Sequence, residues 1–132
     1  MTALSPQGPA GAIAPPRSRE VAAAPTPAMA FEVARVQERA KDATRFLKTL
    51  ANQHRLMILC HLVEGERAVG DLEQRLGIQQ AHLSQQLARL RREGLVRTRR
   101  ESRTIYYSLG NEQAQEMIGT LYRLFCVARS AR

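Results

Sequence analysis

Apolar residues between Gly70 and Val96 recur at helical spacing in two short sets. The two sets are Leu72 and Leu76, then Leu83, Leu87 and Leu90. Residues three or four apart share one face of an α-helix, so each set predicts an amphipathic helix. Gly77 and Gly94 follow the sets, at positions where a left-handed backbone conformation ends a helix. The pattern predicts two helices joined by a tight turn, with Ile78 packed inside the turn.

The second of these helices has a polar face beside its leucines. This face and the start of the helix carry Gln80, His82, Ser84, Gln85 and Arg89. Such side chains hydrogen-bond to base edges and phosphates in a major groove, and two helices around a glycine turn form the helix-turn-helix motif. We therefore predict that these residues contact DNA. For this stretch alone, the alternative is an ordinary helical hairpin with a solvated polar face.

Two terminal helices are predicted to carry narrow apolar stripes. The first helix, expected from Phe31 to Leu50, has its stripe at Val33, Val36, Ala40, Ala43, Leu47 and Leu50. The last helix repeats this spacing at Ala114, Met117, Leu121, Leu124 and Ala128. A stripe this narrow is typical of a helix that pairs with another helix. We therefore expect a homodimer formed through the N- and C-terminal helices and a pseudo-palindromic operator. Packing of both helices on their own domain is the alternative.

A central helix is predicted between these elements. Asn52 is a favourable N-cap for a helix that runs to about Val63. Residues 56–63 are apolar except His61, and a helix that is apolar all round is expected to be buried.

A basic hairpin follows the helix-turn-helix segment. Residues 95–100 and 103–109 read as two strands, with residues 101–102 at the tip. The inward positions are expected to be Ile105, Tyr107 and Leu109. The basic positions are Arg97, Arg99, Arg100 and Arg103, which favours a wing that contacts phosphates. The predicted fold is mainly α with a small β-hairpin: a dimeric winged helix-turn-helix.

Composition supports one basic domain with a nucleic-acid partner. The chain has 132 residues and a net charge of +8, and all but two of its 20 basic residues are arginines. All six prolines lie in residues 1–29, which predicts a disordered extension before a winged-helix domain over residues 30–132. The chain shows no signal peptide and no apolar run long enough to span a bilayer. We therefore expect a cytoplasmic protein that does not associate with a membrane.

Three stretches carry a resemblance to a known family. They are LKTLANQHRLMILCHL over residues 47–62, LSQQLARLRREGLV over residues 83–96 and RRESRTIYYSL over residues 99–109. With the flanking helices, they resemble the ArsR (ArsR/SmtB) family of bacterial winged-helix repressors from Phe31 to the C-terminus. The resemblance implies a homodimer that represses transcription by binding double-stranded operator DNA until an inducer weakens that binding.

The metal sites of that family are absent from this sequence. Its Cys-Val-Cys sensors have cysteines where Ala68 and Gly70 stand here, and its zinc sensors use histidines in the last helix, whereas no histidine follows His82. We therefore expect no metal and no cofactor.

The cysteine pair Cys60 and Cys126, in the contexts RLMILC and LYRLFC, resembles the sulfide- and persulfide-sensing BigR/SqrR branch of the family. This resemblance implies that reactive sulfur species are the inducer. They would join the two thiols through a disulfide or a longer polysulfide bridge and so release the DNA.

The residues alone give these cysteines a weaker case, because cysteines on apolar helices are commonly buried and inert. Arg123 and Arg129 lie three residues either side of Cys126, where their charges favour a thiolate. Cys60 lies toward the C-terminal end of its helix, where the helix dipole disfavours a thiolate. We therefore expect Cys126 to attack first and Cys60 to resolve.

Three other functions are compatible with the sequence. They are a repressor that senses peroxide or general disulfide stress, an architectural DNA-binding protein without a switch, and a protein-interaction module with the same fold. An enzyme is not expected, because His82 and Ser84 lie two residues apart on one helix and so do not face each other.

Overall fold

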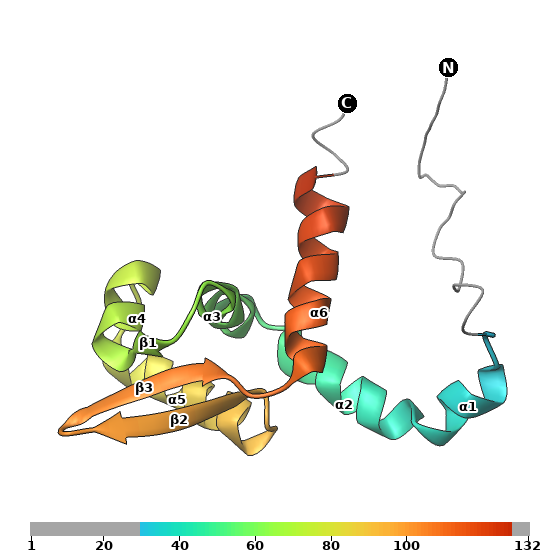
Figure 1. The fold of residues 1–132 in the computed structure, drawn as a ribbon, viewed down its shortest axis with the longest axis horizontal. Coiled ribbons are helices and arrows are strands. Elements are labelled where there is room, and N and C mark those ends of the chain that lie inside the picture. The colour runs from blue at the N-terminus through green and yellow to red at the C-terminus, as the bar shows by residue number, and fades with distance from the viewer. Residues whose placement is uncertain (1–29, 128–132) are drawn as a thin grey trace. The chain divides into compact units, whose positions relative to one another are not determined.

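The computed structural model describes residues 30–127, so the predicted extension over residues 1–29 lies outside the described part of the chain. The chain divides after Ala40 into two units, and the first contains helix α1 (Val33–Glu38). Helix α2 begins at this boundary (Figure 1). The elements from there on are α2 (Ala40–Leu50), α3 (Gln53–Val63), β1 (Arg67–Ala68), α4 (Val69–Leu76), α5 (Gln80–Arg92), β2 (Val96–Glu101), β3 (Thr104–Leu109), α6 (Glu112–Tyr122) and its π-helical continuation η1 (Arg123–Val127).

The single helix predicted from Phe31 to Leu50 is wrong, because the structure has two helices there. Helix α1 ends at Glu38, and Arg39 leaves the helical conformation with φ −111° and ψ 11°. The Arg39 N–H donates to the Val36 carbonyl oxygen at 3.0 Å, which closes the last turn of α1. The apolar spacing runs through this break because it records which side chains share a face, and not whether the backbone hydrogen bonds continue.

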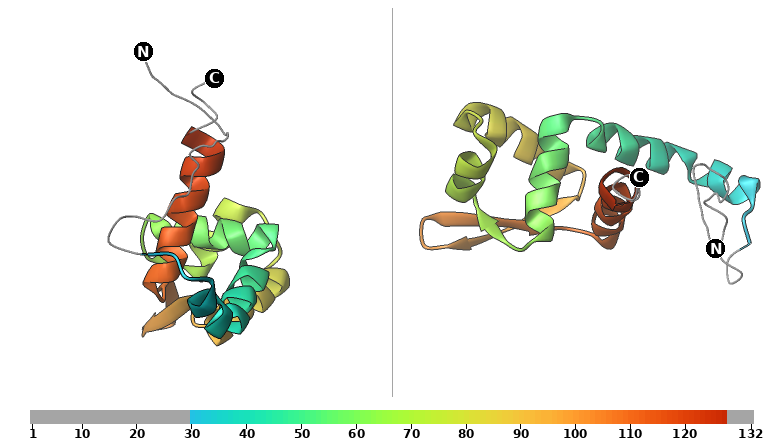
Figure 2. Two further views of the ribbon diagram at one scale, coloured as in Figure 1. Left: turned by 90° about the vertical axis from the view of Figure 1, so that its right-hand side faces the viewer. Right: turned by 90° about the horizontal axis from the view of Figure 1, so that it is seen from above.

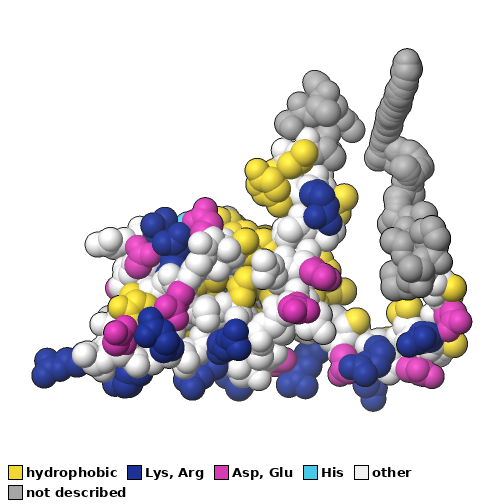
Figure 3. Space-filling view, viewed as in Figure 1, with side chains coloured by type: hydrophobic (Ala, Val, Ile, Leu, Met, Phe, Trp, Pro, Cys, Tyr) yellow, Lys and Arg dark blue, Asp and Glu magenta, His cyan; other side chains and the backbone are white. Residues whose placement is uncertain are grey.

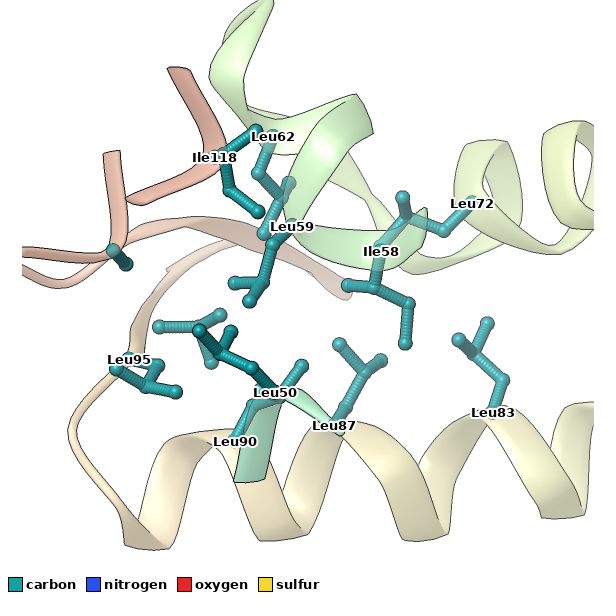
Figure 4. Packing of buried hydrophobic residues seen from close by; sticks show 12 residues of the cluster. Leu50, Ile58, Leu59, Leu62, Leu72, Leu83, Leu87, Leu90, Leu95 and Ile118 are labelled. Atoms are coloured by element: carbon teal, nitrogen blue, oxygen red, sulfur yellow. The ribbon is translucent and has the colours of Figure 1, made fainter. Parts of the chain in front are cut away.

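Helix α3 is the central element of the second unit, as the sequence predicted. It contacts α4, α5, α6 and β3, and in the right-hand view of Figure 2 it runs from α2 toward the sheet. Ile58 and Leu59 of α3 are fully buried. Figure 4 shows leucines of α5 pointing toward them from the opposite side of the core. Burial of these apolar faces is the main force that holds the helices together.

Helix α3 is buried on one side only, which corrects the expectation that it is buried all round. Met57 and Val63 are 40% and 41% exposed, and Cys60 and His61 are half-buried. A domain of this size has a core that covers only one face of its central helix. The outer face of α3 therefore keeps apolar side chains and a thiol accessible in the single chain.

The backbone signals at the helix ends are confirmed. Gly77 and Gly94 have φ values of +64° and +79°, in the left-handed region. The Asn52 side chain caps α3 by accepting a hydrogen bond from the Arg55 N–H at 3.0 Å. Ile78 packs against the core from the turn between α4 and α5, as predicted.

A third strand joins the predicted hairpin. The sheet is antiparallel in the order β1-β3-β2, and β1 escaped prediction because two residues are too few for a periodic signal. The tip consists of residues 102–103, one residue later than predicted, and Ser102 adopts a φ of +57° there. Tyr107 and Leu109 pack against the core as expected, whereas Ile105, nearer the tip, is half-buried.

We predict that Gly110→Ala destabilises the protein. A Cβ at Gly110 would lie 2.6 Å from the Gly94 carbonyl oxygen and 3.1 Å from the Val96 backbone nitrogen. Because backbone atoms would have to move, we expect the free energy of unfolding in urea to fall by about 1–3 kcal/mol.

Gly70→Ala, in α4, is the matched control, because an added Cβ there meets no neighbouring segment within 4 Å. This variant should be neutral or more stable by up to about 1 kcal/mol. Equal unfolding free energies for the two variants would contradict the prediction.

Candidate nucleic-acid interface and dithiol site

Helix α5 exposes most of the polar residues that the sequence assigned to DNA contact. Its buried positions are Leu83, Leu87 and Leu90, which turn into the core (Figure 4). Its exposed predicted positions are Gln80, Ser84 and Gln85, while His82 and Arg89 are half-buried. The outer face of α5 therefore offers amide and hydroxyl groups, and exposed arginines follow at its C-terminal end.

His82 packs against a second histidine that sequence reasoning did not connect with it. Its ring lies edge-to-face on the ring of His54, with ring centroids 4.6 Å apart and an interplanar angle of 71°. His54 lies in the first turn of α3, far from His82 in the sequence. The contact joins the first turns of α3 and α5 and fixes the ring of His82 at the start of the helix.

Arg55 is a buried residue that supports the recognition helix and that the sequence analysis missed. Its Nε donates to the Thr49 carbonyl oxygen at 2.6 Å, and its Nη2 donates to the Lys48 carbonyl oxygen at 3.3 Å. Its Nη1 donates to Gln86 Oε1 at 2.9 Å. Burial, and secondarily the positive charge of Arg89, lowers the pKa of Arg55. One guanidinium thus joins the end of α2 to the middle of α5.

The C-terminal end of α5 is held from two further directions. Arg45 of α2 donates from Nε to Glu93 Oε1 at 2.7 Å. Asn111 uses both ends of its amide: Oδ1 accepts from the Ala114 N–H at 2.8 Å, and Nδ2 donates to the Gly94 carbonyl oxygen at 3.2 Å. Helices α2 and α6 are therefore both attached to the residues that follow α5.

The arginines of the wing have two different environments. The side chains of three exposed arginines, Arg97, Arg100 and Arg103, form no hydrogen bond or ion pair within the described part of the chain. Arg99 instead donates from Nη2 and Nε to the two Glu66 carboxylate oxygens, at 2.8 and 3.0 Å, and from Nη1 to Glu101 Oε1 at 3.1 Å. The ion pair with Arg99 lowers the pKa of Glu66. In Figure 3, Lys and Arg side chains gather along the lower edge of the hairpin and α5.

The two cysteines lie on neighbouring helices, and both are free thiols. Cys60 is half-buried on α3, and Cys126 is exposed in the π-helical turn η1. Burial raises the pKa of the Cys60 thiol, and the charge of Cys126 raises it further. Helix α3 contacts α6, and η1 continues α6, so the two thiols lie on packed neighbouring elements.

One of the two arginines expected to favour a Cys126 thiolate forms a hydrogen bond to another residue. The Arg123 guanidinium donates to Thr120 Oγ1 at 3.1 Å, one turn back along α6. Arg129 lies outside the described residues.

Within residues 30–127, no group of three or more His, Cys, Asp and Glu side chains could hold a metal ion. No helix in that range is long and apolar enough to cross a membrane.

Comparisons with known proteins show the family and the fold to which this chain is similar. Residues 52–98 match the profile of the bacterial regulatory protein, arsR family. The biofilm growth-associated repressor of Xylella fastidiosa is 47% identical over 91 residues, which cover 69% of this chain and 80% of that protein. The crystal structure of the transcriptional repressor BigR from Xylella fastidiosa superposes with a TM-score of 0.71 at 44% identity, covering 74% of this chain and 99% of that one.

Two further relatives have the same fold. The transcriptional activator HlyU of Vibrio cholerae is 46% identical over 96 residues, 70% of this chain and 89% of that protein. The structure of reduced HlyU has a TM-score of 0.66 and covers 70% and 97% of the two chains at 44% identity. A homodimeric winged helix-turn-helix DNA-binding domain from Mycobacterium bovis is 30% identical, with a TM-score of 0.66 over 79% and 96% of the chains. The chain therefore belongs to the ArsR family, and it is a DNA-binding transcriptional regulator with a winged helix-turn-helix fold.

Proposed function

We propose that this protein is a transcriptional repressor controlled by Cys60 and Cys126. It binds operator DNA while both thiols are reduced and releases it when reactive sulfur species bridge them. The observation that carries the proposal is the placement of two free thiols on elements that pack together, Cys60 on α3 and Cys126 in the continuation of α6. The relative whose structure is described as reduced HlyU supports control by oxidation.

The DNA interface is proposed to combine α5 and the wing. The base-reading residues are Gln80, His82, Ser84 and Gln85, and the phosphate-contacting residues are Arg89, Arg97, Arg100 and Arg103. Phosphate contacts set affinity and register, whereas contacts to base edges set the preference for one sequence. The burial of the α5 leucines supports this interface, because it leaves the outer face of α5, with Gln80, Ser84 and Gln85, exposed.

A homodimer is proposed from exposed apolar side chains on the terminal helices. Leu47 of α2 is 54% exposed, and Leu124 and Phe125 of η1 are 56% and 67% exposed. Figure 3 shows hydrophobic side chains uncovered at the end of the α6–η1 helix. Helix α1, in its own unit, exposes Val33 and Val36. Exposed apolar side chains clustered at a helix end mark an interaction site, and the Mycobacterium bovis relative is homodimeric.

The proposed bridge uses the polysulfide itself as the oxidant. The Cys126 thiolate attacks a sulfur of the polysulfide and retains two sulfurs of its chain, while a shorter polysulfide anion leaves. Cys60 then loses its proton to solvent, and its thiolate attacks the sulfur bonded to Cys126 Sγ. The bond from that sulfur to the outer sulfur breaks, and hydrosulfide leaves with the electron pair. The thiols lose two protons and two electrons, and the polysulfide is reduced by two electrons. Because the raised pKa of Cys60 keeps it protonated, the more exposed Cys126 is the first nucleophile.

The length of the bridge would discriminate between oxidants. A direct disulfide needs Cα atoms about 4.4–6.8 Å apart, and each inserted sulfur adds about 2 Å. A polysulfide bridge therefore spans a longer Cα–Cα separation than a disulfide, and a separation beyond the disulfide range would favour donors that supply sulfur over peroxide.

Competing functions can be separated by direct measurements. Intact mass after treatment with sodium tetrasulfide, diamide or peroxide distinguishes a sulfur sensor, which gains sulfur, from a disulfide-stress sensor, which only loses hydrogen. An architectural protein would bind DNA equally before and after treatment. A protein-interaction module would show no salt-dependent binding. The relative HlyU is named an activator. Transcription in vitro with and without the reduced protein would therefore show whether this protein represses or activates.

We predict that base-reading and phosphate-contacting residues separate in their dependence on salt. The ligand would be a labelled duplex selected by the reduced wild-type protein from a random-sequence pool, called here the selected duplex. Replacing Arg100 or Arg103 with Ala should weaken binding to selected and random duplexes alike. It should flatten the plot of log affinity against log salt by about 1.8, since each of the two subunits of the dimer loses one phosphate contact. Replacing Ser84 or Gln85 with Ala should keep the slope and cost about 1–3 kcal/mol of preference for the selected duplex. Identical behaviour of the two groups in fluorescence anisotropy would disprove the assignment.

We predict that Leu47→Glu and Leu124→Glu give monomers that fold. Both side chains are exposed in the single chain, so a charge there opposes association without disturbing the core. Lys41→Gln changes the net charge by the same amount at an exposed position of α2 outside the apolar stripe, and it should stay dimeric. Sedimentation velocity measures the state of each variant. A wild-type-like dimer in both glutamate variants would rule out these helices as the interface.

We predict that Cys60→Ser and Cys126→Ser bind the selected duplex as tightly as the reduced wild type and stay bound in tetrasulfide. The wild type should release the duplex, and a reductant should restore its binding. Release should coincide with a gain of sulfur within one chain in the intact mass. The proposal fails if either single-cysteine variant releases the duplex under the same treatment.

A further inference from the structure

Arg99 has a different environment from the other wing arginines, and its contacts come from β2, β3 and the turn before β1. It projects from β2, and its guanidinium carbon lies 4.6 Å from the centroid of the Tyr106 ring on β3. Glu66, which precedes β1, binds it through both carboxylate oxygens. Bidentate pairs and small networks are the surface ion pairs that have a measurable effect, whereas isolated pairs contribute little.

The strand register places Arg99 on the opposite face of the sheet from Arg100. Arg99 of β2 pairs with Tyr106 of β3. The two residues beside it in β2 pair with the residues on either side of Tyr106: Thr98 with Tyr107 and Arg100 with Ile105. Side chains alternate between the two faces of a sheet, so Arg100 shares the face of Tyr107, which packs against the core. Val96, which shares the face of Arg100, is buried in the core with the leucines of α5, so α5 packs on the side of Arg100. Arg97 shares the face of Arg99, and what distinguishes Arg99 from it is the set of partners of its guanidinium.

The charge around Arg99 also argues against a phosphate contact. Two carboxylates, from Glu66 and Glu101, accept hydrogen bonds from its single guanidinium. Their negative charges cancel its positive charge and would repel a phosphate. Arg100 and Arg103 have no such partners within the part of the chain that the structure describes.

The outer part of the wing needs a support of this kind. Strand β1 pairs with β3 only at Tyr106 and Tyr107, so the hairpin beyond that row consists of two strands. An isolated two-stranded hairpin is marginally stable in water. Arg99 lies in the last three-stranded row, and its contacts tie β2 across β3 to the turn before β1.

We propose that Arg99 and Glu66 position the wing and that Arg99 is not a phosphate contact. The pair holds the hairpin at a fixed angle to the α3–β1 turn, so that Arg100 and Arg103 reach the phosphates beside the groove that α5 occupies. This inference rests on the proposed DNA interface. It reassigns one arginine that the sequence grouped with the other wing residues.

The decisive experiment removes an acidic residue from a DNA-binding protein and asks whether binding weakens. Glu66→Gln raises the net charge by one, so a purely electrostatic role for Glu66 predicts tighter binding to the selected duplex. Positioning predicts binding that is weaker by about threefold to tenfold, a loss of the size expected for a bidentate network. Binding as tight as the wild type or tighter would overturn the proposal.

Arg99→Lys provides the second test, since it keeps the charge but loses the bidentate geometry. It should bind as weakly as Arg99→Ala, and neither variant should change the salt slope, whereas Arg100→Ala should flatten it by about 1.8 for the dimer. Adding Glu66→Gln to Arg99→Lys should cause little further loss. Wild-type affinity in Arg99→Lys, or a slope changed by about 1.8 in Arg99→Ala, would identify Arg99 as a phosphate contact.

Hydrogen exchange separates failure of this inference from failure of the DNA interface. In the DNA-free protein under reductant, amides of residues 99–106 should exchange faster in Glu66→Gln and Arg99→Lys than in the wild type. Amides of α3 should be unchanged and show that the core is folded. Unchanged exchange in the wing would refute the positioning role, whatever the result with DNA. Absence of wild-type binding to any duplex would refute the interface instead.

Discussion

The second unit depends on the guanidinium of Arg55, a charged group buried between helices. The last carbonyl groups of a helix have no partners within that helix, and Arg55 provides two of them with donors at the end of α2. A buried charge is tolerated only when its hydrogen bonds are satisfied, and Gln86 supplies the third acceptor. The exit of α2, the first turn of α3 and the middle of α5 are thereby fixed relative to one another. Removing any one partner would leave part of a buried charge uncompensated.

The same group influences how α5 meets an anion. Arg89 lies close enough for its charge to lower the pKa of Arg55, so the two cations repel each other. Gln86 neutralises none of this repulsion, because its amide is uncharged. A DNA phosphate beside Arg89 would relieve it, whereas Arg55 is held inside by its carbonyl partners.

The helix-turn-helix could be predicted because its signals are local. The spacing of the leucines, the two left-handed glycines and the Asn52 cap each depend on residues within one or two turns. The features that escaped prediction depend on partners distant in the sequence or on backbone detail. Arg99 finds Glu66 across the sheet, and Arg55 finds Gln86 across the core. The break at Arg39 and the π-helical turn around Cys126 leave the side-chain spacing unchanged, so no periodicity reveals them.

The proposed switch can affect DNA binding because α3 and the α6–η1 helix, which carry the two cysteines, are both attached to α5 or to the residues that follow it. Helix α3 carries Arg55, which is bonded to α5, in its first turn and Cys60 toward its other end. Helix α6 begins beside Asn111, which is bonded to the Gly94 carbonyl oxygen, and continues into η1, which contains Cys126. A bridge between the sulfurs would therefore join two helices whose opposite ends hold α5. Close-packed cores do not deform continuously, so a changed angle between α3 and α6 would be taken up at those attachments or at the exposed apolar ends. Because each 1.4 kcal/mol changes affinity about tenfold, a small difference in strain between the two arrangements of α5 is sufficient to release DNA.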